Sequence, residues 1–365
     1  MFFVIGPFPP PVHGMGKNLL VFYNSLCKAV GKQQVAKIDI SPGSLTRGGK
    51  YHATKILKVL FGTLKVFFLG LLNFSKRNVI YMPVDAGWGV IYSTLLLSIS
   101  RLLGMDIFIH HRSYAYINRH SKLMRVFVFI GGKNSTHIFL CKNQEEKYRK
   151  FYKFIGKSIV VSNAGHVEPA RAKKDKNNKK IIIGFLSNIS EEKGILETIE
   201  IFKVLKNQNY PIELHIAGPF DNKSAEELVK ENIRALKGVQ VFGPVYELDK
   251  HNFFSNIDIL IFPTKYKNEA QPNVVFEAMS YFVRPITTNI GCLSSDFILG
   301  GCDTFQEKGN SFVLAASSKI EQYIADRNYL REQQKKSHEI VSNMKASAEK
   351  SYATMLRVVI KGNSE

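Results

Sequence analysis

Two glutamates stand eight positions apart in residues 268–280, which read NEAQPNVVFEAMS. They are Glu269 and Glu277, and Pro272 lies between them. Proline does not fit inside a helix but suits its first turn. The spacing therefore predicts a loop that carries Glu269, followed by a helix that begins near Pro272 and carries Glu277 in its second turn. Two carboxylates placed in this way can accept hydrogen bonds from the hydroxyl groups of a ligand.

The segment before the two glutamates is the element that must position them. Residues 257–263 (IDILIFP) form a short apolar run that ends at a proline, a pattern typical of a fully buried strand. Strand, loop and helix would place both acids at the carboxyl edge of a sheet, where open α/β folds bind ligands. A nucleotide-sugar fits such a site, since it has hydroxyls at both ends and a diphosphate between them. The alternative is a solvated helix face with one capping acid.

A cation for a diphosphate stands upstream of the two acids. Residues 181–186 (IIIGFL) predict a buried strand, and the loop SNISEEKG leads from it into an amphipathic helix over residues 195–207. Lys193 lies at the start of that helix, where its ammonium group could neutralise phosphate charge. A solvated capping lysine is the alternative.

The N-terminal residues predict a second place where backbone could approach a phosphate. A strand over residues 2–5 leads through the loop 6–16 (GPFPPPVHGMG) into a helix over residues 17–30. Gly14 and Gly16 would let the backbone come close to an anion at the start of this helix. A turn without a ligand is the alternative.

Another strand, over residues 106–110 (DIFIH), delivers His110, His111 and Arg112 to a carboxyl edge. A histidine at that position of a doubly wound sheet lies over the ligand cleft. A lone histidine would more often be a core residue, but two histidines and an arginine in succession argue against burial.

Acids are scarce in the same part of the chain. Up to residue 140 they are Asp39, Asp85 and Asp106. The first and the last fall within predicted strands, whereas Asp85 follows a strand over residues 78–82. We therefore expect Asp85 to be the only acid of this region that is well placed near the cleft.

Strand-like and helix-like segments alternate along the whole chain, which predicts an α/β protein with parallel sheets. Its 365 residues exceed one typical core. The polar run 172–180 (AKKDKNNKK) reads as a linker. We predict a basic N-terminal domain over 1–165, a C-terminal domain over 166–345, and a helix over 346–365 that crosses back to the first domain.

Positive charge is concentrated in the first predicted domain. Residues 1–165 hold 23 Lys and Arg against 5 Asp and Glu, a net charge of +18, whereas the remaining residues hold 27 against 25. Such a surface attracts nucleic acid or an anionic membrane. In residues 54–76 the lysines Lys55, Lys58 and Lys65 alternate with long apolar side chains, which favours a helix lying on a membrane over a nucleic-acid groove. A core helix with extended lysine stems is the alternative.

The compartment is predicted from three further features. The longest apolar piece of that helix is too short to span a bilayer, which takes about 20 residues. The start MFFVIGPFPPP lacks a basic region before its apolar run, so it favours a first strand over a signal peptide. Four scattered cysteines without metal-binding spacing suit a reducing cytosol. We expect a cytoplasmic protein on the inner face of the plasma membrane.

Taken together, these residues resemble the GT-B-fold retaining glycosyltransferases, and in particular glycosyltransferase family 4, the glycosyl transferases group 1. The matching motifs occur in the expected order along nearly the whole chain: GPFPPPVHGMG, HHRSYAY, FLSNISEEKGI, LHIAGPF and FFSNIDILIFPTKYKNEAQPNVVFEAM. The resemblance implies two Rossmann-like, doubly wound parallel-sheet domains that face a central cleft, with acceptor bound by the first domain and nucleotide-sugar by the second. It also implies an enzyme of EC class 2.4.

The resemblance implies a role for each candidate residue. Glu269 would hold hydroxyls of the transferred sugar, Glu277 the ribose hydroxyls, and Lys193 the diphosphate. His111, with His110 as second choice, would contact the sugar from the first domain. The remaining donor-binding or additional candidates are Gly14, Gly16, Arg112, Asn188 and Asn273.

Some residues depart from the family pattern. Asn188 stands where an arginine usually lies beside the diphosphate, and Ser187 where a glycine is usual, so the phosphate clamp loses one cation unless Arg112 or another base replaces it. Phe282 stands where glycine is common. No Asp-x-Asp metal motif occurs, in keeping with a family that needs no metal and no cofactor.

The expected activity is transfer from a nucleoside-diphosphate sugar to a glycan, with a lipid-linked acceptor inferred from the basic, apolar first domain. Capsule, lipopolysaccharide O-antigen or exopolysaccharide synthesis would use such a reaction. Because no carboxylate nucleophile is evident, we expect a same-face retaining transfer with Asp85 as acceptor ligand or base. A non-catalytic nucleotide-sugar binder or scaffold of the same fold is the alternative, whereas nucleic-acid binding is not expected.

Overall fold

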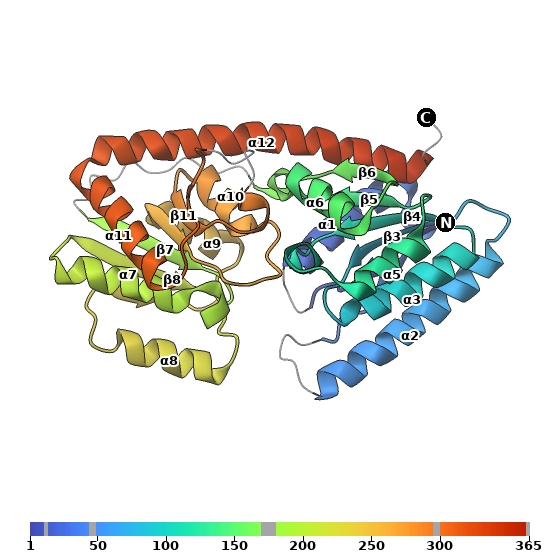
Figure 1. Ribbon diagram of the computed structural model, residues 1–365, viewed down its shortest axis with the longest axis horizontal. Helices are drawn as coiled ribbons and strands as arrows, with labels where there is room; N and C mark the ends of the chain where they lie inside the picture. The colour runs from blue at the N-terminus through green and yellow to red at the C-terminus, as the bar shows by residue number, and fades with distance from the viewer. Residues whose placement is uncertain (11–13, 44–48, 169–179, 295–299, 363–365) are drawn as a thin grey trace. The chain divides into compact units, whose positions relative to one another are not determined.

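The computed structural model of the chain describes residues 1–10, 14–43, 49–168, 180–294 and 300–362 (Figure 1). Its contacts divide the chain into two compact units. Unit 1 comprises Met1–Gly165 and Ser347–Glu365, and unit 2 comprises His166–Ala346. Most of the predicted linker 172–180, and residues 11–13 of the predicted loop 6–16, lie outside the described residues.

Unit 1 is built on a sheet of six parallel strands in the order β2-β1-β3-β4-β5-β6. The strands are β1 (Phe2–Gly6), β2 (Val35–Asp39), β3 (Val79–Val84), β4 (Asp106–His111), β5 (Thr136–Phe139) and β6 (Lys157–Val160). The helices are α1 (Gly14–Val30), α2 (Gly49–Leu72), α3 (Gly89–Leu102), α4 (Ala115–Asn118), α5 (Lys122–Gly131) and α6 (Lys142–Tyr152). Since helices cover both faces, the central strands are apolar throughout rather than alternating.

The two faces of this sheet carry different helices. On one face, α1 packs over β1 and β3, and Phe22 stacks on Tyr81 with ring centroids 3.7 Å apart. On the other face lies α2, where Gly62 is close enough to β2 that an added Cβ would lie 3.1 Å from the side chain of Ile38. Helix α3 contacts both α2 and α5, so the three helices lie side by side (Figure 1).

Unit 2 repeats the architecture with a second sheet of six parallel strands, in the order β12-β11-β10-β7-β8-β9. The strands are β7 (Ile181–Leu186), β8 (Ile212–Ala217), β9 (Val239–Val241), β10 (Ile259–Phe262), β11 (Arg284–Thr288) and β12 (Asp303–Phe305). The helices are α7 (Ile195–Asn207), α8 (Lys223–Ile233), α9 (Glu247–Asn256), α10 (Asn273–Ser280) and α11 (Asn310–Ala325). The predicted parallel α/β architecture is confirmed, although β11 and β12 were not predicted.

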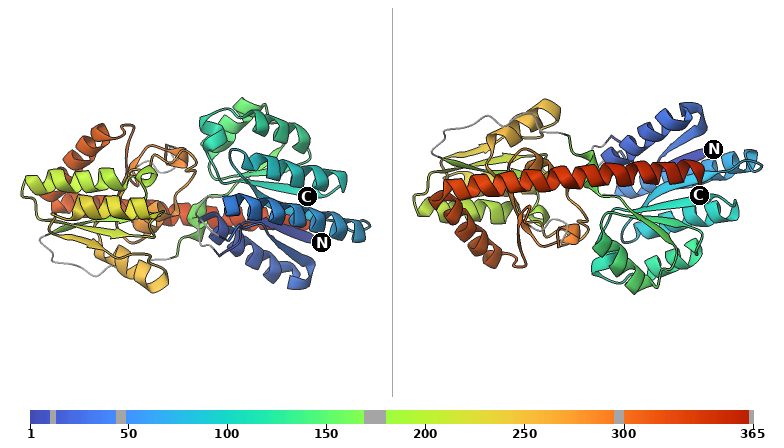
Figure 2. Two further views of the ribbon diagram at one scale, coloured as in Figure 1. Left: turned by 90° about the horizontal axis from the view of Figure 1, so that it is seen from below. Right: turned by 90° about the horizontal axis from the view of Figure 1, so that it is seen from above.

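The last helix belongs to both units. Helix α12 (Arg327–Lys361) is 35 residues long and is drawn as one uninterrupted rod in Figure 2. Its residues up to Ala346 belong to unit 2, and those from Ser347 belong to unit 1. Met355 and Val359 are fully buried in the core of unit 1 beside α1.

The predicted departure at Phe282 has a backbone consequence. Phe282 adopts a φ of 56°, in the left-handed region that favours glycine. For an L-residue this conformation costs about 1–2 kcal/mol. The ring of Phe282 stacks on His338 of α12 with centroids 3.9 Å apart, and this contact offsets part of that cost.

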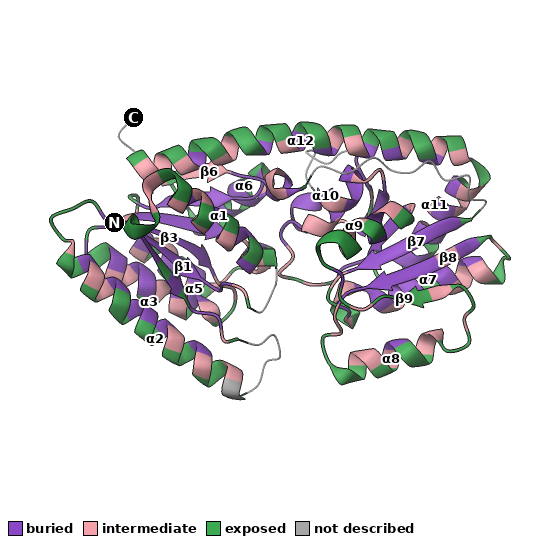
Figure 3. Ribbon diagram, turned by 180° about the vertical axis from the view of Figure 1, so that it is seen from behind, coloured by how far each residue is buried: buried purple, intermediate pink, exposed green. Residues whose placement is uncertain are grey.

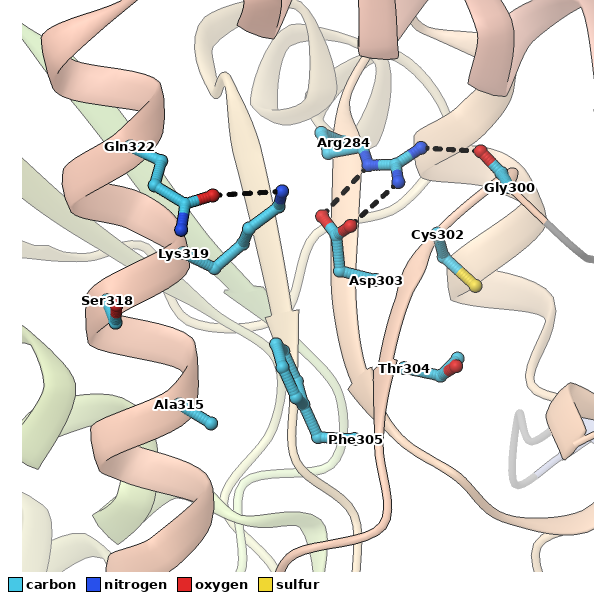
Figure 4. A pocket seen from close by; sticks show the side chains of 10 residues that line it. All are labelled: Arg284, Gly300, Cys302, Asp303, Thr304, Phe305, Ala315, Ser318, Lys319 and Gln322. Carbon is cyan, nitrogen blue, oxygen red and sulfur yellow. Dashed lines mark hydrogen bonds and ion pairs between the residues drawn. The ribbon is translucent and has the colours of Figure 1, made fainter.

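A buried ion pair joins the outer strands of unit 2. Arg284 is 3% exposed and binds Asp303 through two hydrogen bonds of 3.0 and 2.8 Å (Figure 4). The same guanidinium donates to the backbone carbonyl of Gly300 and to Ser337 of α12, while Tyr323 of α11 donates to Asp303. This network fixes β12 and both C-terminal helices to β11.

We predict that Arg284→Met destabilises unit 2 by about 3 kcal/mol or more, because it leaves the partly buried Asp303 carboxylate without its cation. The free energy of urea unfolding measures the change. The matched control is Lys230→Met, which breaks the exposed ion pair with Glu226 on α8 and should cost less than about 0.5 kcal/mol. Equal effects of the two substitutions would contradict a structural role for the buried pair.

Candidate active site

Lys193 and Glu269 meet at the carboxyl edge of the sheet of unit 2. Lys193 ends the short turn Glu191–Lys193 that follows β7, and Glu269 lies on the loop between β10 and α10. Lys193 Nζ lies 2.5 Å from Glu269 Oε2, and the two side chains are 20% and 13% exposed. Lys193 Nζ also lies 4.6 Å from the ring centroid of Tyr266. A cation and a carboxylate from different loops thus form one charged group at this edge.

Close backbone contacts fix the loops that carry this pair. Gly194 has a φ of 86°, and an added Cβ there would lie 2.4 Å from Pro263 at the end of β10. Gly218 has a φ of 130°, and its Cβ would lie 1.7 Å from the carbonyl oxygen of Ser187. The loop after β10 is also joined to helix α7 by an ion pair of 2.7 Å between Lys265 and Glu197. Only glycine allows such an approach at both positions.

Glu277 lies on α10, whose first residue is Asn273 and whose N-cap is Pro272. This places Glu277 in the second turn, as predicted. Its Oε1 lies 2.5 Å from Nζ of Lys250 on α9. Lys250 was not predicted to be a site residue, because a lysine within a helix gives no sign in the sequence of the acid that it pairs with. Each of the two predicted acids is therefore paired with a lysine.

The two asparagines predicted to bind donor differ in exposure. Asn188 is exposed on the loop after β7. Asn273 is half-buried, and its Oδ1 has no hydrogen-bond partner among the described residues. A buried acceptor in that state is available to a ligand donor.

In unit 1 the predicted glycines lie inside a helix rather than before one. Helix α1 begins at Gly14, three residues earlier than predicted, so Gly14 and Gly16 both belong to its first turn. A Cβ on Gly14 would meet no heavy atom within 4 Å. Gly16 is buried.

The expectation that His110 and His111 escape burial is wrong. Their exposed fractions are 2% and 0%. His111 shares hydrogen bonds with Tyr116 at Nδ1 (2.9 Å) and with His137 at Nε2 (2.8 Å). A sugar could reach the imidazole of His111 only if one of those partners moved. The prediction of exposure from two histidines and an arginine in succession fails because each histidine has an aromatic or polar hydrogen-bond partner inside unit 1.

The row of hydrogen bonds from His111 continues through His137 to the buried Ser135, which directly precedes β5. His137 Nε2 lies 3.1 Å from Ser135 Oγ. Burial, and secondly the charge of His137, hold the pKa of His111 well below its usual range. Burial, and secondly the charge of Arg149, lower the pKa of His137 to about 3. Both imidazoles are therefore neutral at neutral pH.

Arg112 takes part in a separate group. Its guanidinium donates to Asn163 Oδ1 (3.0 Å) and lies 3.4 Å from His110 Nδ1, which also contacts the hydroxyl of Tyr81. Asn18 of α1 donates to the same oxygen of Asn163. Arg112 is half-buried.

Asp85 directly follows β3, but it is not the only acid at this edge. Asp39 is the last residue of β2, which also ends there, so the predicted uniqueness of Asp85 is wrong. Lys55 and Lys58 of α2 lie 3.5 Å from Asp85 and Asp39, respectively. The side chain of Lys55 is 10% exposed, so Lys55 cannot belong to an exposed basic surface.

Among the described residues, neither a metal-binding cluster of side chains nor a membrane-spanning helix is found. In the described ranges, no three or more His, Cys, Asp or Glu side chains are grouped so that they could hold a metal ion. Nor does any helix of the described part combine the length and apolar content needed to cross a bilayer.

Residues 166–346, which coincide with unit 2, match the family described as Glycosyl transferases group 1. The chain belongs to this family. Membership places it among the glycosyltransferases, EC class 2.4.

Among curated proteins, the chain is similar to the capsular polysaccharide biosynthesis glycosyltransferase CapM of Staphylococcus aureus. The two are 28% identical over 160 residues, which cover 42% of this chain and 39% of CapM. The match thus spans about two fifths of the length of that relative.

Solved structures share the fold over nearly the full chain. A glycosyltransferase from Rickettsia africae is 14% identical, with a TM-score of 0.68 and coverage of 99% of both chains. Anabaena Alr3699/HepE, solved in complex with UDP and glucose, is 12% identical, with a TM-score of 0.69 and coverage of 98% of this chain and 99% of that one. The family 4 glycosyltransferase therefore has the GT-B fold, as predicted.

We predict that unit 1 loses stability as the pH falls below about 6.5, the usual histidine value in an unfolded chain. Folded His111 and His137 stay neutral while the unfolded chain takes up their protons. The free energy of unfolding should therefore fall by up to about 1.4 kcal/mol per pH unit for each histidine, down to a pH of about 3 for His137.

Urea unfolding, followed by circular dichroism between pH 7.5 and pH 5, measures how the free energy of unfolding changes with pH. This range spans the usual histidine pKa of the unfolded chain. His137→Gln keeps a hydrogen-bonding side chain but cannot titrate, so its slope should be shallower whatever its stability at neutral pH. The same slope in both proteins would show that these histidines do not account for the pH dependence.

Proposed function

We propose that this chain is a retaining, metal-independent glycosyltransferase that moves a sugar from a nucleoside-diphosphate sugar to a lipid-linked glycan in bacterial surface polysaccharide synthesis. The observation that carries the proposal is the pairing of Lys193 with Glu269 at the carboxyl edge of unit 2. An ammonium and a carboxylate in contact suit a ligand that has a phosphate next to a sugar hydroxyl. The name of CapM supports a surface polysaccharide as product.

In the proposed donor site, the pair Lys193–Glu269 separates when the donor binds. Lys193 turns from Glu269 to the diphosphate and stabilises the charge that develops on the leaving group. Glu269 then accepts hydroxyls of the transferred sugar, and Glu277 accepts the ribose hydroxyls. Asn273 adds the acceptor atom Oδ1, which lacks a partner in the described residues.

Lys250 supplies a second cation to this site. Its ion pair holds Glu277 in place, and it compensates in part for the arginine that the family usually has where this chain has Asn188. Gly14 and Gly16, in the first turn of α1, remain candidates for presenting backbone N–H groups to a phosphate. Arg112 remains a further candidate, whereas contacts through His110 or His111 would require their buried rings to be released.

The proposed transfer takes place on one face of the sugar. The bond between the sugar and the diphosphate breaks, the acceptor oxygen bonds to the same face, and the leaving phosphate takes the acceptor proton. Asp85 binds the acceptor or assists as base, and its pairing with Lys55 keeps a cation beside it. A covalent glycosyl-enzyme trapped on Asp85 would rule this mechanism out.

A thermal-shift screen across nucleoside-diphosphate sugars tests the donor site. UDP-sugars come first, because HepE was solved with UDP. We predict that one donor stabilises the protein selectively, by about 2.7 kcal/mol at a hundredfold excess over its Kd. Glu277→Gln should abolish the shift, Lys250→Met should reduce it, and Asp85→Asn should keep it. A shift that survives Glu277→Gln would refute the assigned ribose contact.

Catalysis is tested separately from binding. Lys193→Met should lower the rate of nucleoside diphosphate release about 10²–10³-fold, since it removes a group that stabilises the leaving charge. The matched control is Lys265→Met, which breaks the neighbouring pair with Glu197 and should leave the rate within a few-fold of the parent. If the parent protein binds a donor but never releases free nucleoside diphosphate with any acceptor, the chain is the non-catalytic binder that is the alternative.

A further inference from the structure

The outer side of α2 exposes a continuous row of large apolar side chains. Positions 57, 61, 64, 68 and 72 repeat at the spacing of one helix face, and Phe61 and Leu72 are 70% and 80% exposed. The exposed large apolar residues of α2 are Ile56, Leu57, Leu60, Phe61, Leu64, Phe68, Leu71 and Leu72. The opposite side of the same helix, with Val59 and Val66, is buried against unit 1. Exposed residues line α2 along its length in Figure 3.

The neighbouring helices extend this row into a surface. Helix α3 contacts α2 on one side and α5 on the other. Their exposed large apolar residues are Trp88, Ile91, Leu95, Leu102, Val126 and Phe129. We call these residues together with those of α2 the three-helix surface. An exposed patch of this extent marks an interaction site rather than ordinary solvent-facing surface.

The charged residues around the three-helix surface indicate which kind of partner it binds. Helices α2, α3 and α5 contain no Asp or Glu, and between residues 40 and 141 the acids are Asp85 and Asp106 alone. Asp85 pairs with Lys55, and Asp106 pairs with Arg77 at 2.6 Å. The exposed basic residues on or beside the three helices include Lys65, Lys76, Arg101, Lys122, Arg125 and Lys133. The three-helix surface is therefore apolar and positively charged at once.

We infer that the three-helix surface lies in the headgroup region of an anionic lipid bilayer, with its apolar side chains at the acyl boundary. A helix with an apolar outer face and basic residues beside it has this property. Two copies of the chain could not pair through it without bringing like charges together. The inference rests on the proposed function for its purpose, because a lipid-linked acceptor has to be met at such a boundary.

The inward lysines of α2 give the surface its orientation toward the proposed acceptor site. Lys55 and Lys58 pair with Asp85 and Asp39 at the carboxyl edge of the sheet of unit 1. The same helix thus contacts that edge on one side and the bilayer on the other. Attraction to the membrane comes from the exposed bases and not from Lys55, contrary to the sequence-based expectation.

The single tryptophan of the chain reports this contact without a label. Trp88 stands at the N-cap of α3 and is 80% exposed. The full chain is mixed with vesicles of phosphatidylcholine, with and without phosphatidylglycerol, in the absence of any donor. We expect cosedimentation and a blue shift of Trp88 emission with the anionic vesicles. Binding without a blue shift would overturn the insertion of this surface.

Variants test whether vesicle binding depends on the three-helix surface or on exposed apolar side chains in general. Phe61→Ser with Phe68→Ser should lower the partition coefficient at least about tenfold, because two large apolar groups lose their burial in lipid. The matched control is Leu248→Ser with Leu314→Ser, two exposed apolar residues of unit 2, and it should bind as the parent does. Lys65→Gln and Lys122→Gln should each weaken binding to anionic vesicles about fivefold.

Two outcomes would overturn the inference. One is unchanged partitioning of the Phe61→Ser, Phe68→Ser protein while its circular dichroism matches the parent. The other is a dimer in solution that the same substitutions dissociate, which would assign the surface to a second copy of the chain. Donor-induced thermal shifts are measured on the same variants without vesicles, so failure of membrane binding and failure of the proposed donor site are told apart.

Discussion

The ion pair between Lys193 and Glu269 is the interaction on which the proposed site depends. It forms because two loops that follow neighbouring strands, β7 and β10, approach each other at one edge of a parallel sheet. That approach requires glycine at position 194, where any Cβ would overlap Pro263. With both side chains mostly shielded from water, neither charge is stable without the other or a ligand that replaces it. A donor that offers a phosphate to one group and a hydroxyl to the other satisfies both.

Unit 1 arranges its charges in a different way. Asp39, Asp85 and Asp106 are each paired with a lysine or an arginine, and the buried His111 and His137 stay neutral. One helix, α2, separates two functions: the inward lysines contact the acids at the carboxyl edge, and the outward residues are apolar. A protein surface that is apolar, carries basic residues and holds no acid is suited to binding anionic lipid. The positive charge of unit 1 is thus concentrated on particular faces and is not spread evenly over the unit.

Two of the residues that depart from the family pattern are Phe282 and Asn188, and other side chains of unit 2 offset their effects. Phe282 adopts the left-handed backbone that a glycine would adopt without cost, and its stacking on His338 stabilises it. In the proposed donor site, the loop after β7 has Asn188 in place of a cation, and Lys250 adds a cation beside Glu277. Both compensations come from residues distant in sequence, on α12 and α9.

The sequence by itself determined the alternation of strands and helices, the family, and the placement of Glu277 in the second turn of α10, because hydrophobic period and proline positions are local signals. It did not determine which charges meet. The partners of Glu277, Asp85 and Asp39 lie 27, 30 and 19 residues away, on elements that only the sheet order brings near. Burial of His110 and His111 was equally hidden, since polar residues enter a core only when tertiary neighbours supply their hydrogen bonds. The tertiary structure therefore decided which polar residues are enclosed and which side of α2 faces outward.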